Sequence, residues 1–206
     1  MATSGSGSVA ERIVIASSNP GKQREVREIL RAKALLGRTL ALIDLSDLPP
    51  VSFPEEGADY RSNAIEKARA VAMQIGEIAL ADDSGLEVDA LEGRPGPHSA
   101  RYGGAGLDDA GRVELLLREL RGVPRAGRGA RFVCVAALVT PGGEVLSARG
   151  ECPGEILAEV RGRRGFGYDP VFQASGLTQT MAELSSDEKN RISHRAQALQ
   201  ALFESS

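Results

Sequence analysis

Two adjacent carboxylates, Asp82 and Asp83, follow a short apolar run in the sequence and precede Ser84 and Gly85. Adjacent carboxylates that leave a buried strand are electrostatically costly unless a cation or water compensates their charge. Oxygen ligands of this kind suit Mg²⁺, and the carboxyl ends of strands are where α/β folds bind their ligands. The pair therefore indicates a site for a divalent cation. The alternative is an Asx turn closed by Ser84 and Gly85.

A segment similar to a phosphate-binding loop lies between the first predicted strand and the first predicted helix. It consists of Ser17, Ser18, Asn19, Pro20, Gly21 and Lys22. A standard P-loop is absent from the sequence, because Ala16 replaces its first glycine and Gln23 its metal-binding hydroxyl residue. Small residues at a helix N-terminus still expose backbone N–H groups to an anion, and Lys22 would add a positive charge. The segment therefore fits either phosphate binding or a plain strand-to-helix turn.

An aromatic segment with glycines follows a basic run at residues 161–164. It consists of Phe166, Gly167, Tyr168, Asp169 and Pro170. Only 4% of the chain is aromatic, and an aromatic residue between glycines is not needed for a helix or a strand. Such a ring can stack on a nucleobase, which is worth about 1–3 kcal/mol per base. The alternative is a turn that tucks Phe166 into the core.

Three basic residues near the C-terminus, Lys189, His194 and Arg195, lie at the base of a predicted amphipathic helix. Lysine and arginine only donate hydrogen bonds, whereas a 6-keto purine presents the acceptors O6 and N7. These residues therefore suit the reading of such a base. An ordinary surface helix also accounts for them.

A second acidic pair, Glu55 and Glu56, lies in the loop before a predicted helix that carries Asn63 and Lys67. Asn63 and Lys67 are four residues apart, so they share one face of that helix. By itself the acidic pair is typical of a solvated loop.

The bulk composition is that of an ordinary globular protein with one substantial domain: 206 residues, 42% apolar and 26% charged. A net charge of -3 leaves no basic excess to cover the phosphates of a nucleic acid, so no such partner is expected. No segment approaches the ~20 apolar residues of a membrane span, and the first residues lack the apolar core of a signal peptide. We expect a disordered tail over residues 1–11, one domain over residues 12–206, no membrane association and a cytoplasmic location.

The hydrophobic pattern predicts the elements that position these residues. Strands are expected at residues 12–16, 40–45, 78–81, 86–91, 132–140, 144–152 and 155–160. Helices are expected at residues 23–30, 60–75, 108–120 and 185–203, with a Gly- and Pro-rich loop over residues 93–106. The alternation of strands and helices with one β-hairpin predicts an α/β fold with a mixed sheet.

Taken together, these segments resemble the inosine triphosphate pyrophosphatase family, also called Ham1-like proteins, which remove non-standard purine nucleotides. The matching segments follow the family order from about residue 12 to residue 203, and this order makes the match highly specific. They are residues 17–22, 55–68, 81–91, 95–102, 166–170 and 182–195. One departure is the family's usual Thr-Gly-Asn, which is here Ser17-Ser18-Asn19, followed by Pro20.

The resemblance implies a role for each matching residue. The phosphates would be held by the segment from Ser17 to Lys22. Glu55 and Asp83 would hold Mg²⁺, and Asp83 would also activate water with the support of Asp82, although the sequence leaves open which aspartate takes the proton. Further substrate contacts are implied for Lys67, Ser84, Phe166, Gly167, Tyr168, Asp169, Lys189, His194 and Arg195. The family also implies an elongated mixed β-sheet flanked by helices, two lobes with a central cleft, and a homodimer.

The implied reaction is the Mg²⁺-dependent hydrolysis of deaminated purine nucleoside triphosphates (ITP, dITP or XTP) to the monophosphate and pyrophosphate. Adenine would be disfavoured, because its 6-amino group would point protons at lysine or arginine donors. One unpaired buried polar group costs about 1–3 kcal/mol, so roughly 100-fold discrimination is reachable. Two alternatives stay open. One is a Maf-like nucleotide pyrophosphatase with another base preference, and the other is a regulatory nucleotide-binding protein without turnover.

Overall fold

The computed structural model describes residues 11–32, 40–104 and 106–204. Within these residues seven strands form one sheet. The sheet is mixed, as the sequence predicts, although the strands are not all those expected. The strands are β1 (Glu11–Ile15), β2 (Leu40–Asp44), β3 (Ile78–Val88), β4 (Pro95–Gly96), β5 (Gly129–Val139), β6 (Val145–Ile156) and β7 (Phe172–Ala174). The expected tail lies outside the described residues, except that Glu11 already belongs to β1.

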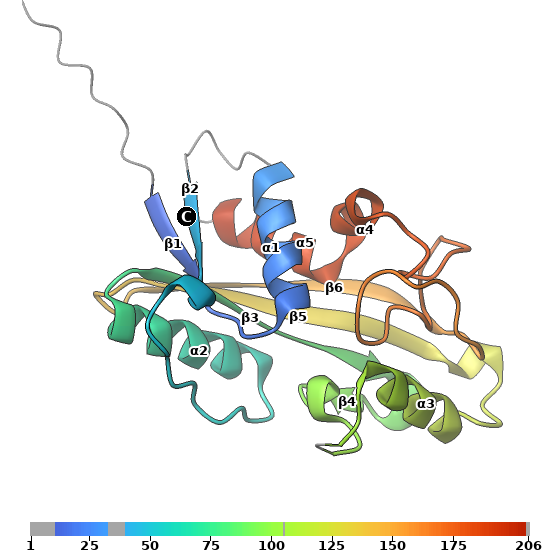
Figure 1. Ribbon diagram of the computed structural model, residues 1–206. Helices are drawn as coiled ribbons and strands as arrows, with labels where there is room; N and C mark the ends of the chain where they lie inside the picture. Colours follow the sequence, from blue (N-terminus) through green and yellow to red (C-terminus); the bar gives the residue numbers. More distant parts are fainter. Residues whose placement is uncertain (1–10, 33–39, 105, 205–206) are drawn as a thin grey trace, which may run out of the picture.

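The sheet has the order β2-β1-β3-β5-β6-β7, and β4 pairs with the far part of β3. β1 is parallel to both β2 and β3, whereas the pairs that involve β4 to β7 are antiparallel. The three long strands β3, β5 and β6 have 11 or 12 residues each and extend along the length of the molecule (Figure 1). The elongated mixed sheet is therefore confirmed.

Helices cover both faces of this sheet. They are α1 (Pro20–Ala32), α2 (Tyr60–Ile75), α3 (Asp109–Glu119), α4 (Ser186–Ile192) and α5 (His194–Glu204). Short 3-10 helices occupy Leu45–Asp47, Asp89–Leu91, Ser99–Arg101 and Arg125–Gly127. α1, α4 and α5 lie on one face, α2 lies on the other, and α3 lies beyond α2 beside β4 (Figure 1). No helix of the described part has the length and apolar character needed to cross a membrane.

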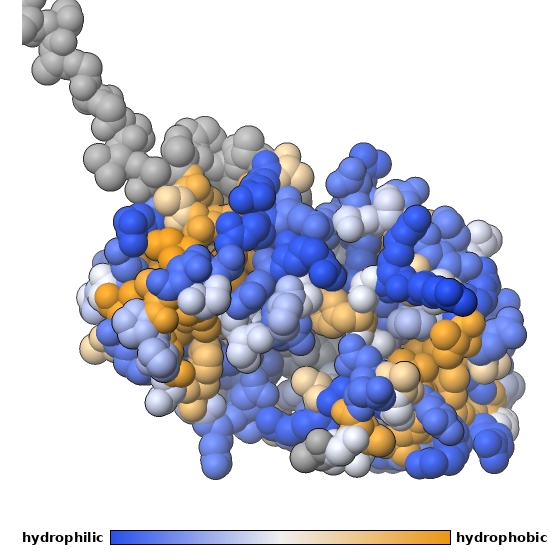
Figure 2. Space-filling model, viewed as in Figure 1, coloured by the Kyte–Doolittle hydropathy of each residue, from blue (hydrophilic) through white to orange (hydrophobic). Residues whose placement is uncertain are grey.

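The apolar side chains form separate cores at the two ends of the long strands. Near β1, residues such as Ile29 of α1 and Leu199 of α5 pack on one face, while α2 packs on the other through small residues such as Ala68. At the far end, Leu116 of α3 packs with Phe172 and its neighbours. These cores define two lobes. Figure 2 shows apolar surface at both ends of one face and a band of hydrophilic side chains between them.

Two helix ends explain how the C-terminal residues are positioned. Ser193 ends α4 and then caps α5, since its Oγ accepts a hydrogen bond from Ala196 N at 3.2 Å. α5 lies directly on β6 because Gly150 has no side chain: a Cβ there would lie 2.2 Å from His194 O. The break at Ser193 and this close approach direct His194 and Arg195 into the protein. The single predicted helix over residues 185–203 is thus two helices.

The strand predictions differ from the structure in the centre of the chain. β3 is one strand, so Asp82, Asp83 and Ser84 lie inside it and the alternative Asx turn at this position is wrong. β6 continues without a break to Ile156, and the separate strand predicted at residues 155–160 is not formed. β7, which has only three residues, has no counterpart among the predicted strands. Long continuous strands are favoured here because β5 pairs along nearly the whole of both neighbours.

Candidate active site

The predicted acidic pair lies at an open stretch of the edge of β3. β1 pairs with Ile78 to Leu80 of β3, and β4 pairs with Leu86 and Glu87. Between these pairings, no strand of the described chain covers that side of β3, whereas β5 covers the opposite side throughout. The open stretch faces the turn that follows β1. It lies between the two lobes, at the central cleft.

Asp82 and Asp83 point to opposite faces of the sheet, because successive side chains of a strand alternate. Asp83 contacts Lys67 of α2, while Asp82 contacts Arg195 of α5. The two carboxylates therefore do not share one environment, in contrast to the single acidic cluster expected from the sequence. This separation gives them different electrostatic properties.

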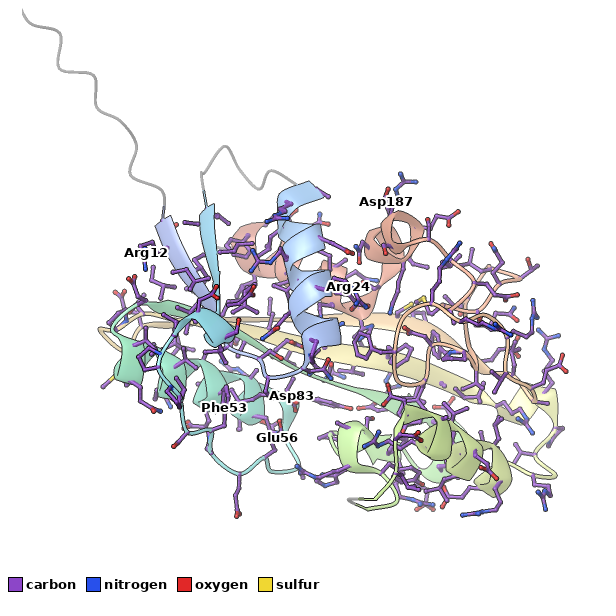
Figure 3. All side chains as sticks on the ribbon, in the orientation of Figure 1. Arg12, Arg24, Phe53, Glu56, Asp83 and Asp187 are labelled. Carbon is purple, nitrogen blue, oxygen red and sulfur yellow. The ribbon has the colours of Figure 1, made fainter. Side chains whose placement is uncertain are left out.

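Asp83 is held by the Asn63 and Lys67 face of α2, which the sequence predicts. Asn63 Nδ2 donates to Asp83 Oδ2 at 2.9 Å, and Lys67 Nζ lies 3.1 Å from Asp83 Oδ1. Burial raises the pKa of Asp83 above its ordinary value, although the positive charges of Lys67 and Lys22 reduce the shift. A carboxylate with a raised pKa at an open strand edge is suited to accept a proton. Figure 3 shows Asp83 beneath the N-terminal end of α1, close to Glu56.

Asp82 is a buried anion between two cations. Its Oδ2 atom lies 3.2 Å from Lys22 Nζ and 3.1 Å from Arg195 Nη2. Burial raises its pKa, but the charges of Arg195, Lys22 and Lys67 outweigh that effect and hold the pKa well below its ordinary value. Asp82 therefore stays ionised and anchors the two cations. Its environment does not suit a general base.

The helix after the β1 turn begins three residues earlier than predicted, because Pro20 is already the first residue of α1. Proline is well suited to this position because its missing N–H has no helical partner there. Asn19 Oδ1 accepts a hydrogen bond from Lys22 N at 3.1 Å, and Ser17 Oγ accepts one from Asn19 N at 3.2 Å. Ser18 is exposed beside them. The helix N-terminus and Lys22 thus face the open edge of β3, as an anion site requires.

Phe166 lies against this turn. A Cβ at Gly21 would be only 2.7 Å from Phe166 Cδ1, so the ring packs directly on the glycine backbone. The same ring lies 5.1 Å from Lys189 Nζ and 5.8 Å from the Arg195 guanidinium carbon. The ring is half-buried and lines the cleft. The alternative of a ring tucked into the core is therefore wrong.

The neighbours of Phe166 have supporting positions. Asp169 is buried, accepts a hydrogen bond from Phe166 N at 2.9 Å and pairs with Lys189 at 2.5 Å. Tyr168 packs in the core of the far lobe and donates from its hydroxyl to Ser99 O at 3.1 Å. Gly167 N donates to Asp109 Oδ2 at 2.7 Å. Of the predicted segment, Phe166 is thus the residue with a ring available to a ligand.

Glu25 of α1 belongs to the site, although the sequence motifs did not indicate it. Its buried carboxylate pairs with Lys189 Nζ at 2.6 Å and with the Arg195 guanidinium. Burial raises the pKa of Glu25, but the charges of Arg195 and Lys189 outweigh this and lower it overall. A sequence signal did exist, because Glu25 precedes Ile29 by four residues and so lies on the apolar face of the helix.

Arg195 is fully engaged by protein groups. Besides Glu25 and Asp82, its Nη2 atom donates to Ser84 Oγ at 3.0 Å, and the residue is 1% exposed. Its charge acts on the cleft mainly through this network, so the structure favours a supporting role over the direct base reading expected for it. Lys189 is similarly held between Glu25 and Asp169.

His194 is neutral and has a free ring nitrogen. Burial, together with the charges of Arg195 and Lys189, lowers its pKa well below the ordinary value. The ring stacks on Phe132 with centroids 4.8 Å apart, and its Nδ1 atom is buried without a partner in the described part of the chain. A neutral imidazole can present one donor and one acceptor. His194 therefore lines the cleft and keeps one buried ring nitrogen without a partner in the described part of the chain.

The two predicted metal residues, Glu55 and Asp83, differ in their surroundings, and Asp83 is buried. Glu55 is exposed, whereas Glu56 pairs with Lys67 at 3.0 Å and with Arg101 at 3.1 Å. Among the described residues, no three His, Cys, Asp or Glu side chains form a cluster that could hold a metal ion. The carboxylate oxygens still suit Mg²⁺, which proteins commonly bind through one or two carboxylates together with substrate phosphates. The donor set thus fits a cation that arrives with a phosphate ligand.

Two cavities adjoin at this end of the cleft. The smaller one has a volume of about 90 Å³ and is lined by residues from both lobes, including Lys22, Ser84, Phe166, Lys189 and His194. The larger one, about 690 Å³, is a groove between α3 and residues 158–170. The smaller cavity is the one beside the acidic pair, because Lys22 and Arg195, the cations that pair with Asp82, line it and do not line the groove.

The cleft combines cations with an aromatic ring beside them. A nucleotide needs both, positive charge for its phosphates and an aromatic face for its base. The fold and the cleft thus define an α/β protein of the nucleotide-binding class. The sequence profile of the Ham1 family matches residues 13–205. The chain belongs to the Ham1 family.

Relatives of known sequence and structure agree with this assignment. A dITP/XTP pyrophosphatase of Bacillus subtilis is 45% identical over 194 residues, which are 94% of this chain and 96% of the relative. One from Frankia alni is 48% identical over 93% of this chain and 95% of its own length. A HAM1 protein structure from Coxiella burnetii is 41% identical, has a TM-score of 0.81, and covers 95% of this chain and 98% of its own.

Proposed function

We propose that the protein hydrolyses deaminated purine nucleoside triphosphates such as ITP, dITP and XTP to the monophosphate and pyrophosphate. The observation that carries the proposal is the position of Asp83: its pKa is raised, and it lies beside Lys67 at an open strand edge that faces the N-terminus of α1. The related dITP/XTP pyrophosphatases cover nearly the whole chain and support the same activity.

In the proposed reaction, water attacks the α-phosphorus, the bond from this phosphorus to the oxygen shared with the β-phosphate breaks, and pyrophosphate leaves. Asp83 orients the attacking water and takes its proton, since it lies at the open strand edge beside Lys67 and opposite the N-terminus of α1. Lys22 and the backbone N–H groups at the start of α1 stabilise the charge that develops on the leaving pyrophosphate. Such a preorganised donor is typically worth about 3–4 kcal/mol in the transition state.

Mg²⁺ is proposed as the cofactor. Asp83 and Glu55 would hold it together with phosphate oxygens, and the bound cation would neutralise the triphosphate. Glu55 is the available partner because Glu56 is already paired with Lys67 and Arg101, whereas Glu55 makes no ion pair in the described part of the chain. Lys67, between Glu56 and Asp83, keeps a positive charge at the site in the absence of the metal.

The base is proposed to lie on the ring of Phe166, with His194 at its polar edge. A neutral His194 can donate to the 6-keto oxygen of hypoxanthine or xanthine, whereas the 6-amino group of adenine offers no matching acceptor. Lys189 and Arg195 add positive potential at the same edge through the network with Glu25. This polarity favours deaminated purines over adenine.

A homodimer and a cytoplasmic location stay predictions. Light scattering coupled to size-exclusion chromatography measures the first: a mass of about twice the 21.7 kDa chain is expected, and a monomeric mass would contradict it.

The test of the function is pyrophosphate release from ITP, XTP, GTP, ATP and their deoxy forms, with Mg²⁺ and with EDTA. A Mg²⁺-dependent preference for ITP, dITP and XTP is the expected result. Turnover with another base preference would favour the Maf-like alternative. Binding of these nucleotides without any turnover would favour the regulatory binding protein.

A further inference from the structure

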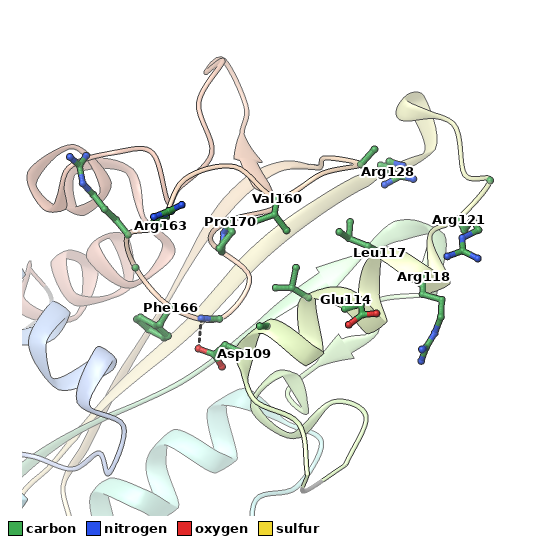
Figure 4. Close-up of a pocket in the computed structure, with 17 residues that line it drawn as sticks. Asp109, Glu114, Leu117, Arg118, Arg121, Arg128, Val160, Arg163, Phe166 and Pro170 are labelled. Carbon is green, nitrogen blue, oxygen red and sulfur yellow. Dashed lines mark hydrogen bonds between the residues drawn. The ribbon is translucent and has the colours of Figure 1, made fainter.

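The loop that carries Phe166 is tied to a distant helix by one hydrogen bond. Gly167 N donates to Asp109 Oδ2 at 2.7 Å, and the two residues are 58 positions apart in the sequence. Figure 4 shows this contact at the first turn of α3, where the loop passes over the helix. Asp109, Phe166 and Gly167 line both the 90 Å³ cavity and the adjoining 690 Å³ groove, so the contact lies at the boundary between them.

The position of this loop decides where the stacking ring lies. Phe166 packs on Gly21 with no room for a methyl group, and it covers Lys189 and Arg195 at 5.1 and 5.8 Å. On its C-terminal side the loop is fixed by the buried Asp169, which accepts from Phe166 N. Gly167 itself has a φ of +60°, a conformation that glycine adopts without strain. The contact with Asp109 adds to these bonds by holding the backbone N–H of Gly167 itself.

Asp109 is in turn oriented by Arg112. Arg112 Nη1 lies 3.0 Å from Asp109 Oδ1, so the other carboxylate oxygen remains for Gly167. Arg112 also lines the small cavity, and its Nε atom is buried without a partner among the described residues. The carboxylate is thus held in one orientation at the mouth of the cavity although its own side chain is exposed.

We infer that Asp109 is a positioning residue for base binding: through Gly167 N it fixes the loop that places the Phe166 ring. The inference rests on the proposed function, because it concerns the binding of a nucleobase in that site. Asp109 does not touch the reacting phosphates, so its effect falls on binding and not on the chemical step. Loss of an interaction that contributes equally to ground-state and transition-state binding raises KM and leaves kcat unchanged.

The test compares Asp109→Ala, Asp109→Asn and the wild type in ITP hydrolysis, with the thermal midpoint of each variant measured in parallel. Asp109→Ala is expected to raise KM for ITP about tenfold and to leave kcat within about twofold. Asp109→Asn keeps an oxygen acceptor for Gly167 N and is expected to restore KM to within about threefold of the wild type. Equilibrium binding of ITP in EDTA, measured by calorimetry, should weaken in parallel with KM.

Glu114→Ala is the matched control, since Glu114 is an exposed acid of the same helix that lines the groove and not the small cavity. Its KM should equal that of the wild type. An unchanged KM in Asp109→Ala, or an Asp109→Asn variant as defective as Asp109→Ala, would overturn the inference. A fall in kcat alone, or a lower thermal midpoint with normal KM, would do the same. Absence of ITP turnover in the wild type would instead overturn the proposed function, and the calorimetric comparison would still test the role of Asp109.

Discussion

Asp82 and Asp83 are neighbours in the sequence, yet their carboxylates lie on opposite faces of β3 and have pKa values shifted in opposite directions. Asp82 is locked between Lys22 and Arg195, whereas Asp83 is bound to Asn63 and Lys67 of α2. One strand thereby supplies a permanent anion to one side of the cleft and a proton acceptor to the other. This division of roles can be tested by substitution.

Asp83→Asn is expected to lower kcat for ITP by about 10²–10⁴-fold, the usual contribution of a general base. The amide keeps the shape of the side chain, and Lys67 keeps Glu56 as an anionic partner, so the thermal midpoint should change little. Steady-state kinetics and calorimetry measure both quantities. Near-normal turnover would remove Asp83 from the mechanism.

Asp82→Asn should act mainly on stability. The substitution removes a buried anion that pairs with Lys22 and Arg195, and an uncompensated buried charge costs about 3–5 kcal/mol. Because Arg195 retains Glu25, we expect a loss of unfolding free energy near the lower end, about 3 kcal/mol. Urea unfolding of both aspartate variants provides the comparison. Equal stability of the two would contradict the separation of their roles.

Gly21→Ala is expected to raise KM for ITP about tenfold, because the added methyl group would meet the Phe166 ring at 2.7 Å and displace it. Gly106→Ala is the matched control, since a Cβ there has no neighbour within 4 Å. Steady-state kinetics give KM for ITP in both variants. If both behave as the wild type, the packing of Phe166 on the turn has no part in base binding.

Glu55→Gln should raise the Mg²⁺ concentration that gives half-maximal activity, and Glu56→Gln should change it less. The reason is that Glu55 is free of ion pairs in the described part of the chain, whereas Glu56 is engaged by Lys67 and Arg101. Magnesium titrations of ITP hydrolysis measure this. A larger effect of Glu56→Gln than of Glu55→Gln would indicate that Glu56, and not Glu55, contacts the metal.

We expect the free energy of unfolding to decrease as the pH is lowered from 7.5 to 5.5, because His194 is buried in its neutral form. Its pKa in the folded protein lies well below the ordinary value, so below about pH 6.5 the unfolded chain binds a proton that the folded chain does not. The free energy of unfolding therefore has its full value above about pH 6.5. It decreases as the pH falls further, with a limiting slope of about 1.4 kcal/mol per pH unit. Urea unfolding of the wild type and His194→Gln at three pH values tests it, and identical slopes would refute it.

The local part of the site follows from the sequence, because each motif is contiguous and its element can be recognised by periodicity. The spacing of four predicts that Asn63 and Lys67 share a helix face, and in the structure this shared face contacts Asp83. The turn from Ser17 to Lys22 likewise precedes a helix. Such spacing arguments need no knowledge of tertiary structure.

Contacts between distant segments could not be predicted in this way. Glu25 meets Lys189 from 164 positions away, and Asp109 meets Gly167 from 58. The opposite faces of Asp82 and Asp83 also depend on β3 continuing through them, and that continuity comes from pairing with β5 along nearly its whole length. The sequence shows which side chains have suitable chemistry, whereas the sheet decides which of them meet.

The open stretch of β3 has a consequence for self-association. Unpaired strand edges are templates on which another chain can add a strand and start aggregation. Here the open stretch is bounded by β1 on one side and by β4 on the other, so it spans only the few residues between Leu80 and Leu86. A small ligand can reach that backbone, but an incoming strand would collide with β1 or β4 before it could form a ladder. This stretch of β3 thus exposes a polar strand edge for binding but is too short to be a nucleus for intermolecular β-sheet.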